Sequence, residues 1–216
     1  MLKKILAFII SAIPCNLFRI IFYRIILKYQ ISFSSRIGLF TVIAVDEATI
    51  IDAKIGKFNK FVGPYRLEID EGSFIGYKNN FNCGEWVVNF PDSQYLRTCK
   101  IGKKTLITNF HFIDTSGGFE LNENSWLAGK SSEFWTHGAG AVDRAISIGK
   151  DCYIGSGVKL APGVVIGNNN LIGLGSVLTQ NFNVENALIA GNPAKVIREN
   201  YFWQKGAWGK DYRHDS

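Results

Sequence analysis

The sequence predicts an all-β coil with three flat faces, preceded by a helical segment and followed by a short helix and tail. Eight Ile-Gly pairs occur, where random order of the 26 Ile and 22 Gly among 216 residues would give about three. From residue 148 to residue 178 an aliphatic residue recurs at every sixth position. A period of six matches neither a helix nor an isolated strand. It suits a coil with one inward aliphatic on each face and a turn of about 18 residues.

Residues 1–30 are expected to form two short helices, because Pro14 interrupts a long apolar run. The basic start of this run also resembles a signal peptide, but no small-x-small cleavage site follows it. A single span would bury Arg19 and Arg24, at a cost of about 3 kcal/mol for each. Helices that cap the coil or lie on a membrane surface are therefore favoured over a signal peptide or a span.

The coil itself is expected over residues 31–198. Upstream of residue 146 the six-residue spacing recurs in short runs that are out of register with one another. Loops are therefore expected to interrupt the coil near residues 83–100 and 129–145. An ordinary β-sandwich is the alternative, but six consecutive aliphatics in one phase favour the coil. Residues 199–216 mix aromatic and basic side chains, which suits either an interfacial anchor or a tail packed on a neighbouring subunit.

Charge and cysteine usage narrow the function classes. The net charge is +6, and many basic residues lie near the two ends of the chain. No nucleic-acid-binding motif accompanies them, so anionic lipid or a phosphate-bearing small molecule fits better than nucleic acid. The four cysteines are widely spaced and form no C-x-x-C pair, which argues against a zinc site and for a reducing compartment. The expected location is the cytoplasm, with association with the inner face of the cell membrane left open.

Four segments in the last third of the chain resemble the C-terminal signature of the hexapeptide-repeat acyltransferases. They are Ile-Gly-Lys-Asp-Cys-Tyr-Ile-Gly-Ser-Gly at 148–157, Ala-Pro-Gly-Val-Val-Ile-Gly at 161–167, Ile-Gly-Leu-Gly-Ser-Val at 172–177 and Ala-Gly-Asn-Pro-Ala-Lys-Val-Ile-Arg at 190–198. The nearest branch is the O-acetyltransferases of sugars, lipopolysaccharide and capsule. The resemblance implies a left-handed parallel β-helix, acetyl-CoA as co-substrate without a metal, and a homotrimer with sites between chains.

His137 is the expected catalytic base. It lies in the interruption before the regular coils, where the resembled family places its general base, and an imidazole pKa near 6.5 suits that task. A base of this kind needs an orienting carboxylate, for which Asp143, Glu133 and Asp114 are candidates. Asp143 is favoured because it shares the loop. His111 is expected to be a surface residue.

The remaining site residues follow from the resemblance. The backbone N–H of Ser156 is expected to stabilise the oxyanion and to contact the acyl carrier. The expected coenzyme A contacts are Leu174, Thr179, Gln180, Lys195 and Arg198. The family usually has a basic residue at the position of Gln180, and the i, i+3 spacing of Lys195 and Arg198 would bring them together on a terminal helix.

Asn82, Trp135 and Tyr153 are expected to contact the acceptor. Phe81-Asn82-Cys83 resembles the region in which an Asn of the sugar acetyltransferases contacts the acceptor, and aromatic rings stack on sugars.

The predicted function is therefore transfer of acetyl from acetyl-CoA to a sugar hydroxyl in cell-surface polysaccharide or lipopolysaccharide biosynthesis. The acceptor is a free or lipid-linked glycan. N-acetylation of a nucleotide-linked amino sugar and a non-catalytic scaffold are the alternatives. A metal-dependent hydratase on the same coil would need three His ligands, more than the chain offers outside its tail.

Overall fold

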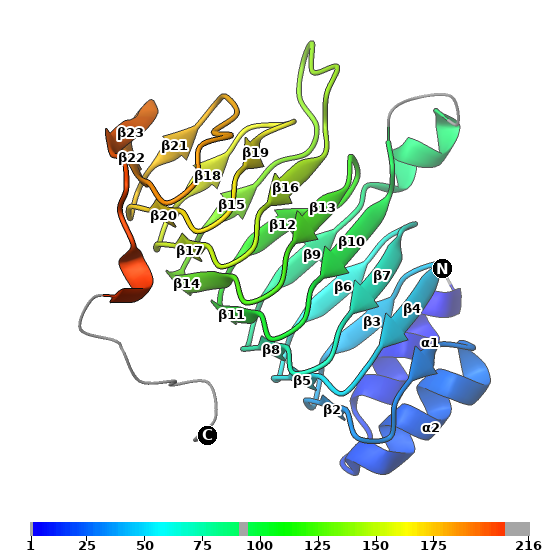
Figure 1. Cartoon of the computed structure of the whole chain (residues 1–216). Helices are drawn as coiled ribbons and strands as arrows, with labels where there is room; N and C mark the ends of the chain where they lie inside the picture. Colours follow the sequence, from blue (N-terminus) through cyan, green and yellow to red (C-terminus); the bar gives the residue numbers. More distant parts are fainter. Residues whose placement is uncertain (1, 91–94, 206–216) are drawn as a thin grey trace.

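The computed structural model describes residues 2–90 and 95–205. Within them the chain winds into stacked coils with three flat faces, as Figure 1 shows. Each face is a sheet, and successive coils pair in parallel along all three sheets. One antiparallel pair ends the array. The all-β coil that the sequence predicts is thus confirmed.

The three sheets are named here in the order in which the chain enters them. Sheet A contains β1 (Gln30–Ile31), β4 (Glu47–Ile50), β7 (Arg66–Ile69), β10 (Thr98–Ile101), β13 (Phe119–Leu121), β16 (Ile146–Ile148) and β19 (Val165–Ile166). Sheet B contains β2 (Arg36–Ile37), β5 (Lys54–Ile55), β8 (Phe74–Ile75), β11 (Leu106–Asn109), β14 (Trp126–Lys130), β17 (Tyr153–Ile154), β20 (Leu171–Ile172), β22 (Leu188–Gly191) and β23 (Ala194–Arg198). Sheet C contains β3 (Val42–Ala44), β6 (Lys60–Val62), β9 (Asn80–Asn82), β12 (Phe112–Asp114), β15 (Glu133–Phe134), β18 (Lys159–Leu160) and β21 (Val177–Leu178).

The inward aliphatics of successive coils stack on one another. Ile154 pairs with Ile172 in sheet B, and Leu160 pairs with Leu178 in sheet C. These side chains are at most 1% exposed. The interior is a continuous apolar column, because each coil buries its own aliphatics only when the next coil covers them.

Two helices close the N-terminal end of the column. They are α1 (Leu2–Ser11) and α2 (Asn16–Ile26), separated around Pro14. Ala7, Ile10, Ile20 and Tyr23 are buried in the same core as the coil aliphatics. The Tyr23 hydroxyl donates to the Thr41 carbonyl, which ties α2 to the first coil. None of the helices in the described ranges is both long and apolar enough to cross a membrane.

The two expected interruptions are present, but the second is shorter than predicted. The first follows β9 and contains a 3-10 helix, η1 (Glu85–Asn89). The second was expected over residues 129–145. However, β15 pairs with β12 and β18 as a regular strand of sheet C, so this loop covers residues 135–145.

The C-terminal end differs from expectation in one respect. Lys195 and Arg198 lie on β23, antiparallel to β22, and not on a terminal helix. The chain reverses at Pro193, and β23 then pairs with the free edge of β22. The only helical turn that follows among the described residues is η2 (Trp203–Lys205). The rest of the tail and His214 lie outside the described residues.

Candidate functional site

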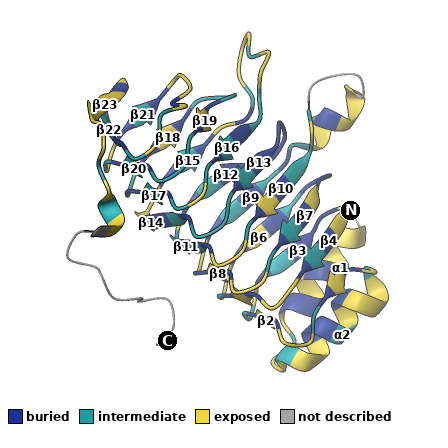
Figure 2. Cartoon of the chain, in the orientation of Figure 1, coloured by how far each residue is buried: buried dark blue, intermediate teal, exposed yellow. Residues whose placement is uncertain are grey.

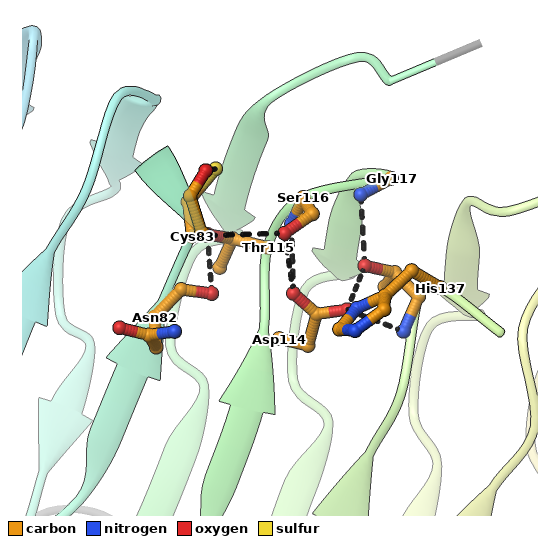
Figure 3. A network of polar contacts seen from close by, with 9 residues as sticks. Asn82, Cys83, Asp114, Thr115, Ser116, Gly117 and His137 are labelled. Carbon is orange, nitrogen blue, oxygen red and sulfur yellow. Dashed lines mark hydrogen bonds and ion pairs between the residues drawn. The ribbon is translucent and has the colours of Figure 1, made fainter. Parts of the chain in front are cut away.

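The candidate site lies at the corner where the chain leaves sheet C and enters sheet A. We call it the C–A corner. Asn82 ends β9 and Asp114 ends β12, and the parallel register pairs these two residues. His137 lies in the loop that follows β15, one coil further along. Figure 3 shows the polar contacts that connect these strand ends.

His137 and Asp114 form a closely bonded pair. Nδ1 of His137 lies 2.6 Å from Oδ2 of Asp114. The Asp114 side chain is only 2% exposed, whereas that of His137 is 37% exposed. Because an ionised carboxylate can only accept, Nδ1 carries the proton of the neutral ring. Nε2 is then left with a free lone pair that can accept a proton.

The Asp114 carboxylate is held by four further hydrogen bonds. Thr136 donates to Oδ2 from its backbone N–H (2.8 Å) and its hydroxyl (2.6 Å). Ser116 donates to Oδ1 from its backbone N–H (3.1 Å) and its hydroxyl (2.7 Å). Burial by itself would raise the pKa of Asp114, but the bonds from Thr136, Ser116 and His137 outweigh it and leave the pKa below its ordinary value. Asp114 is therefore a fixed negative charge at neutral pH.

Gly117 allows the loop after β15 to approach the network closely. Its N–H donates to the Thr136 hydroxyl oxygen over 2.8 Å, which orients that hydroxyl toward Asp114. A Cβ at Gly117 would lie 2.5 Å from the Thr136 carbonyl oxygen and 2.5 Å from the Cβ of Arg144. Only glycine fits without moving one of these neighbours.

Asp143, the expected orienting carboxylate, does not take that place. It is exposed in the same loop as His137, and its backbone packs against Gly163 of the next coil. There it lines a shallow groove together with Arg144 and Asn181. Glu133, the other local candidate, accepts from the indole Nε1 of Trp135 and pairs with Lys159. The carboxylate that contacts His137 comes instead from the preceding coil.

Two tryptophan rings stand beside His137. The ring centroid of Trp86 lies 5.4 Å from that of His137, and the centroid of Trp135 lies 6.0 Å from it, both at steep angles. Each indole is nearly two-fifths exposed. Trp135 was predicted to contact the acceptor, but Trp86 of η1 was missed. The aromatic residues of the first interruption, Trp86, Phe90 and Tyr95, are the signal that could have identified it.

His111 is buried, contrary to the expectation of a surface residue. It is 1% exposed. Its Nδ1 accepts from the Ser132 N–H, and Nε2 lies 3.0 Å from the Thr108 hydroxyl. Burial lowers the pKa of His111 to about 4. Both ring nitrogens are occupied, so His111 is a neutral core residue that links neighbouring coils.

Ser156 and Leu174 lie at a different corner, between sheets B and C, which we call the B–C corner. Gly155 and Gly157 donate their N–H groups to carbonyls of neighbouring coils. The N–H of Ser156 has no such partner within the described residues, and the same holds for Leu174 one coil later. The Leu174 side chain is 81% exposed. Both corner residues therefore offer a backbone donor to a molecule at the surface.

The other predicted residues are also distributed away from His137. Thr179 and Gln180 are exposed after β21, and Lys195 and Arg198 are exposed on β23. Tyr153 lies on sheet B, where its ring packs against Trp126 and Trp203. Its ring thus belongs to an aromatic cluster on a face that does not border the C–A corner. The structure brings Asn82, Asp114, Trp135 and His137 to one corner of one chain, but not Tyr153 or Ser156.

The described ranges contain no group of three or more His, Cys, Asp or Glu side chains that could hold a metal ion. All four cysteines are free thiols. Cys15 is exposed and the other three are buried.

Comparison with known proteins identifies the repeat. Residues 145–180 match the bacterial transferase hexapeptide family, described as six repeats. Galactoside O-acetyltransferase of Escherichia coli (strain K12) is 44% identical over 71 residues, which cover 33% of this chain and 34% of that protein. The chain therefore spans only about a third of the length of this relative.

Solved structures show the same fold over most of the chain. UDP-N-acetylglucosamine O-acyltransferase (LpxA) from Moraxella catarrhalis RH4 has a TM-score of 0.55 and 17% identity, and the match covers 80% of this chain and 70% of that one. The polysialic acid O-acetyltransferase OatWY has a TM-score of 0.52 and 21% identity, with 87% and 92% covered. The coil register, the three parallel sheets and the matched repeats agree: residues 145–180 resemble the bacterial transferase hexapeptide family, and the chain folds as a left-handed parallel β-helix.

Proposed function

We propose that the protein transfers an acetyl group from acetyl-CoA to a sugar hydroxyl, with His137 as the general base. The observation that carries this proposal is the His137–Asp114 pair. A buried carboxylate holds the proton on Nδ1 and leaves the lone pair of Nε2 as the proton acceptor, which is the arrangement that general-base catalysis at an imidazole requires.

In the proposed reaction, Nε2 of His137 removes the proton from the acceptor hydroxyl as its oxygen attacks the thioester carbonyl carbon. The carbon–oxygen bond forms, and the carbonyl oxygen becomes an oxyanion. Collapse of this intermediate breaks the carbon–sulfur bond, and the leaving thiolate takes the proton from Nε2. Asp114 stabilises the imidazolium that exists between the two proton transfers.

A second copy of the chain completes the site in this proposal. His137 lies at the C–A corner, whereas the free N–H groups of Ser156 and Leu174 lie at the B–C corner, on the other side of sheet C. A neighbouring protomer whose B–C corner faces His137 would supply the oxyanion donor. A homotrimer satisfies this requirement three times, because each protomer contributes one corner of each kind.

The acyl carrier would lie along the B–C corner. Ser156 and Leu174 offer backbone donors there, and Lys195 and Arg198 offer cations for the phosphates of coenzyme A. Thr179 and Gln180 lie at the C–A corner of the last complete coil. They would therefore contact a carrier that is bound at the B–C corner of the facing protomer. Tyr153, predicted as an acceptor contact, is the weakest of the predicted contacts, because its ring packs in the Trp126–Trp203 cluster.

A sugar is the favoured acceptor because of the groups around His137. Trp86 and Trp135 present partly exposed rings on which the apolar face of a sugar can stack. Asn82 lies on the strand beside Asp114 and could bond a neighbouring hydroxyl. The similarity to galactoside O-acetyltransferase, whose name gives a sugar derivative as its acceptor, supports a sugar acceptor. A cell-surface glycan or its lipid-linked precursor is the class we propose.

The test is release of free thiol from acetyl-CoA with a panel of free sugars, nucleotide-linked amino sugars and lipid-linked sugars. For the wild-type protein we expect release with a hydroxyl acceptor. For His137→Ala we expect a fall of about 10²–10⁴-fold with an unchanged melting temperature. Equal release by both proteins would refute His137 as the base. Release with amino sugars alone would replace O-acetylation by N-acetylation, and no release with any acceptor would favour a scaffold.

A further inference from the structure

The two N-terminal helices expose an apolar face that the core does not use. Figure 2 shows how much of the outer surface of α1 and α2 is exposed. Seven large apolar side chains on these helices are between 49% and 69% exposed; they are Leu2, Ile5, Phe8, Ile9, Leu17, Phe18 and Ile25. We call them the cap face.

The cap face is separate from the side of the helices that packs on the coil. Ala7 and Ile10 of α1 and Ile20 and Tyr23 of α2 are buried, and they account for the core contact. A helix on the surface of a water-soluble domain places polar residues on its outer side. Here the outer side is apolar as well, and a contiguous patch of this kind marks an interaction surface.

The N-terminal segment that carries the cap face is basic, and the acidic groups beside α1, Asp46 at Lys3 and Glu85 at Lys4, come from later parts of the chain. The first 45 residues contain six Lys and Arg and no Asp or Glu, so the rest of the chain is balanced with 18 of each sign. Residues 1–45 therefore account for the whole net charge of +6. Arg24, Lys28 and Arg36 are exposed. The Arg24 guanidinium lies 4.6 Å from the centroid of the exposed Phe33 ring, so basic and apolar groups are interleaved.

We propose that the cap face docks on a bilayer that contains anionic phospholipid. The apolar side chains would enter the acyl boundary, and the basic residues would meet the lipid phosphates. Helices of 10 and 11 residues are about 15 Å long, half the thickness of the hydrocarbon core, so they would lie along the interface and not cross it.

An ion pair connects the cap to the wall of the candidate site. Lys4 of α1 lies 2.6 Å from Glu85 at the start of η1. The next residue, Trp86, faces His137. Docking through the cap face would therefore place the first interruption near the membrane. The C–A corner, which this interruption borders, would lie beside the end of the coil that faces the bilayer.

The experiment is flotation of the full chain with phosphatidylcholine vesicles that contain or lack phosphatidylglycerol. We expect binding only with phosphatidylglycerol. Ile25→Ser should reduce partitioning about tenfold, and Lys28→Glu should reduce it about fivefold. Ile197→Ser on β23 and Lys100→Glu on β10 change exposed residues of the same types outside the cap face, and should leave partitioning unchanged.

Three results would overturn the proposal. The first is no flotation with phosphatidylglycerol, and the second is equal loss in the cap and control variants. The third is a smaller particle mass for Ile25→Ser in the absence of vesicles, which would identify the cap face as a contact between copies of the chain. Thermal melting of each variant verifies its fold. The measurement uses no acetyl-CoA and no acceptor, so its failure is distinct from failure of the proposed acetyl transfer.

Discussion

Replacement of Asp114 by Asn is the most informative single change in the candidate site. The side chain keeps its size but loses the negative charge that faces Nδ1 of His137. In the proposed reaction, that charge matters most when His137 has taken the proton and is an imidazolium. The variant therefore tests whether Asp114 acts on the reaction through His137 or only holds the loop in place.

The expected size follows from the geometry. Two unit charges about 4 Å apart attract by about 4 kcal/mol at an effective dielectric constant of about 20. Solvent on the open side of the His137 ring, which is 37% exposed, reduces this attraction to about 3 kcal/mol. Since about 1.4 kcal/mol changes a rate tenfold, kcat for Asp114→Asn should fall about 10²–10³-fold.

The same substitution should lower stability. The two oxygens of Asp114 receive backbone N–H donors from Thr136 and Ser116. An amide group has one oxygen, so its NH₂ must face one of these backbone N–H groups. A backbone N–H can only donate, so the two donors would face each other. A buried donor without an acceptor costs about 1–3 kcal/mol, or about 2–10 °C of melting temperature in a chain of this size.

The assay is kcat for thiol release with a working acceptor, together with the melting temperature and the ¹⁵N shifts of the His137 ring. Asp143→Asn is the matched control, because it removes a carboxylate of the same loop that does not contact His137. A kcat for Asp114→Asn within twofold of wild type would refute the role assigned to the pair. An equal fall in both variants would show that loop charge in general, and not this carboxylate, is what matters.

Three further changes test the surroundings of the site. Gly117→Ala should lower the melting temperature by about 2–10 °C and impair activity, because the added Cβ would lie 2.5 Å from a backbone oxygen. Gly138→Ala, whose added Cβ would lie 3.6 Å from its nearest neighbour, should do neither. Equal melting temperatures of the two variants would contradict this reasoning. Burial lowers the pKa of His111 to about 4 in the folded chain, below its unfolded value near 6.5. Its contribution to the free energy of unfolding should therefore be full above pH 6.5. That contribution, up to about 3 kcal/mol, should be lost as the pH falls from 6.5 to 4. Denaturant titrations across this range should show a weaker pH dependence for His111→Gln than for wild type. Trp86→Ala should raise the acceptor KM about threefold to tenfold and leave the acetyl-CoA KM unchanged, whereas Trp203→Ala should change neither. A Trp86 variant that alters only the acetyl-CoA KM would contradict its place on the acceptor side.

The coil could be predicted from the sequence because its signal is local and repeated. From residue 148 to residue 178 each inward aliphatic lies six residues from the next, so the corner that separates them has constant length there. The stacking of Ile154 on Ile172 and of Leu160 on Leu178 follows from this spacing alone. The end of the coil was predicted less well. Lys195 and Arg198 have a helical spacing, but the free edge of β22 offered a pairing that local propensity does not describe.

The site could be predicted only in part. His137 was predicted as the base because it lies in an interruption of the repeat, at the place where the resembled family has its base. Its carboxylate partner was misassigned to Asp143, six residues away, because proximity in the chain was the only guide. Asp114 is 23 residues before His137, but the two lie on adjacent coils about 5 Å apart along the stack. Whether they meet depends on the number of residues inserted at each corner.

The sequence by itself determined the architecture: the period of six, the Ile-Gly pairs and the apolar run broken at Pro14 specify a capped coil with two interruptions. Only the tertiary structure decided which side chains share the C–A corner. A one-dimensional repeat fixes the contacts that recur in every coil. The contacts of Trp86, Asp114 and His137 arise once, where insertions of unequal length fold back on the stack, and no periodic signal encodes them.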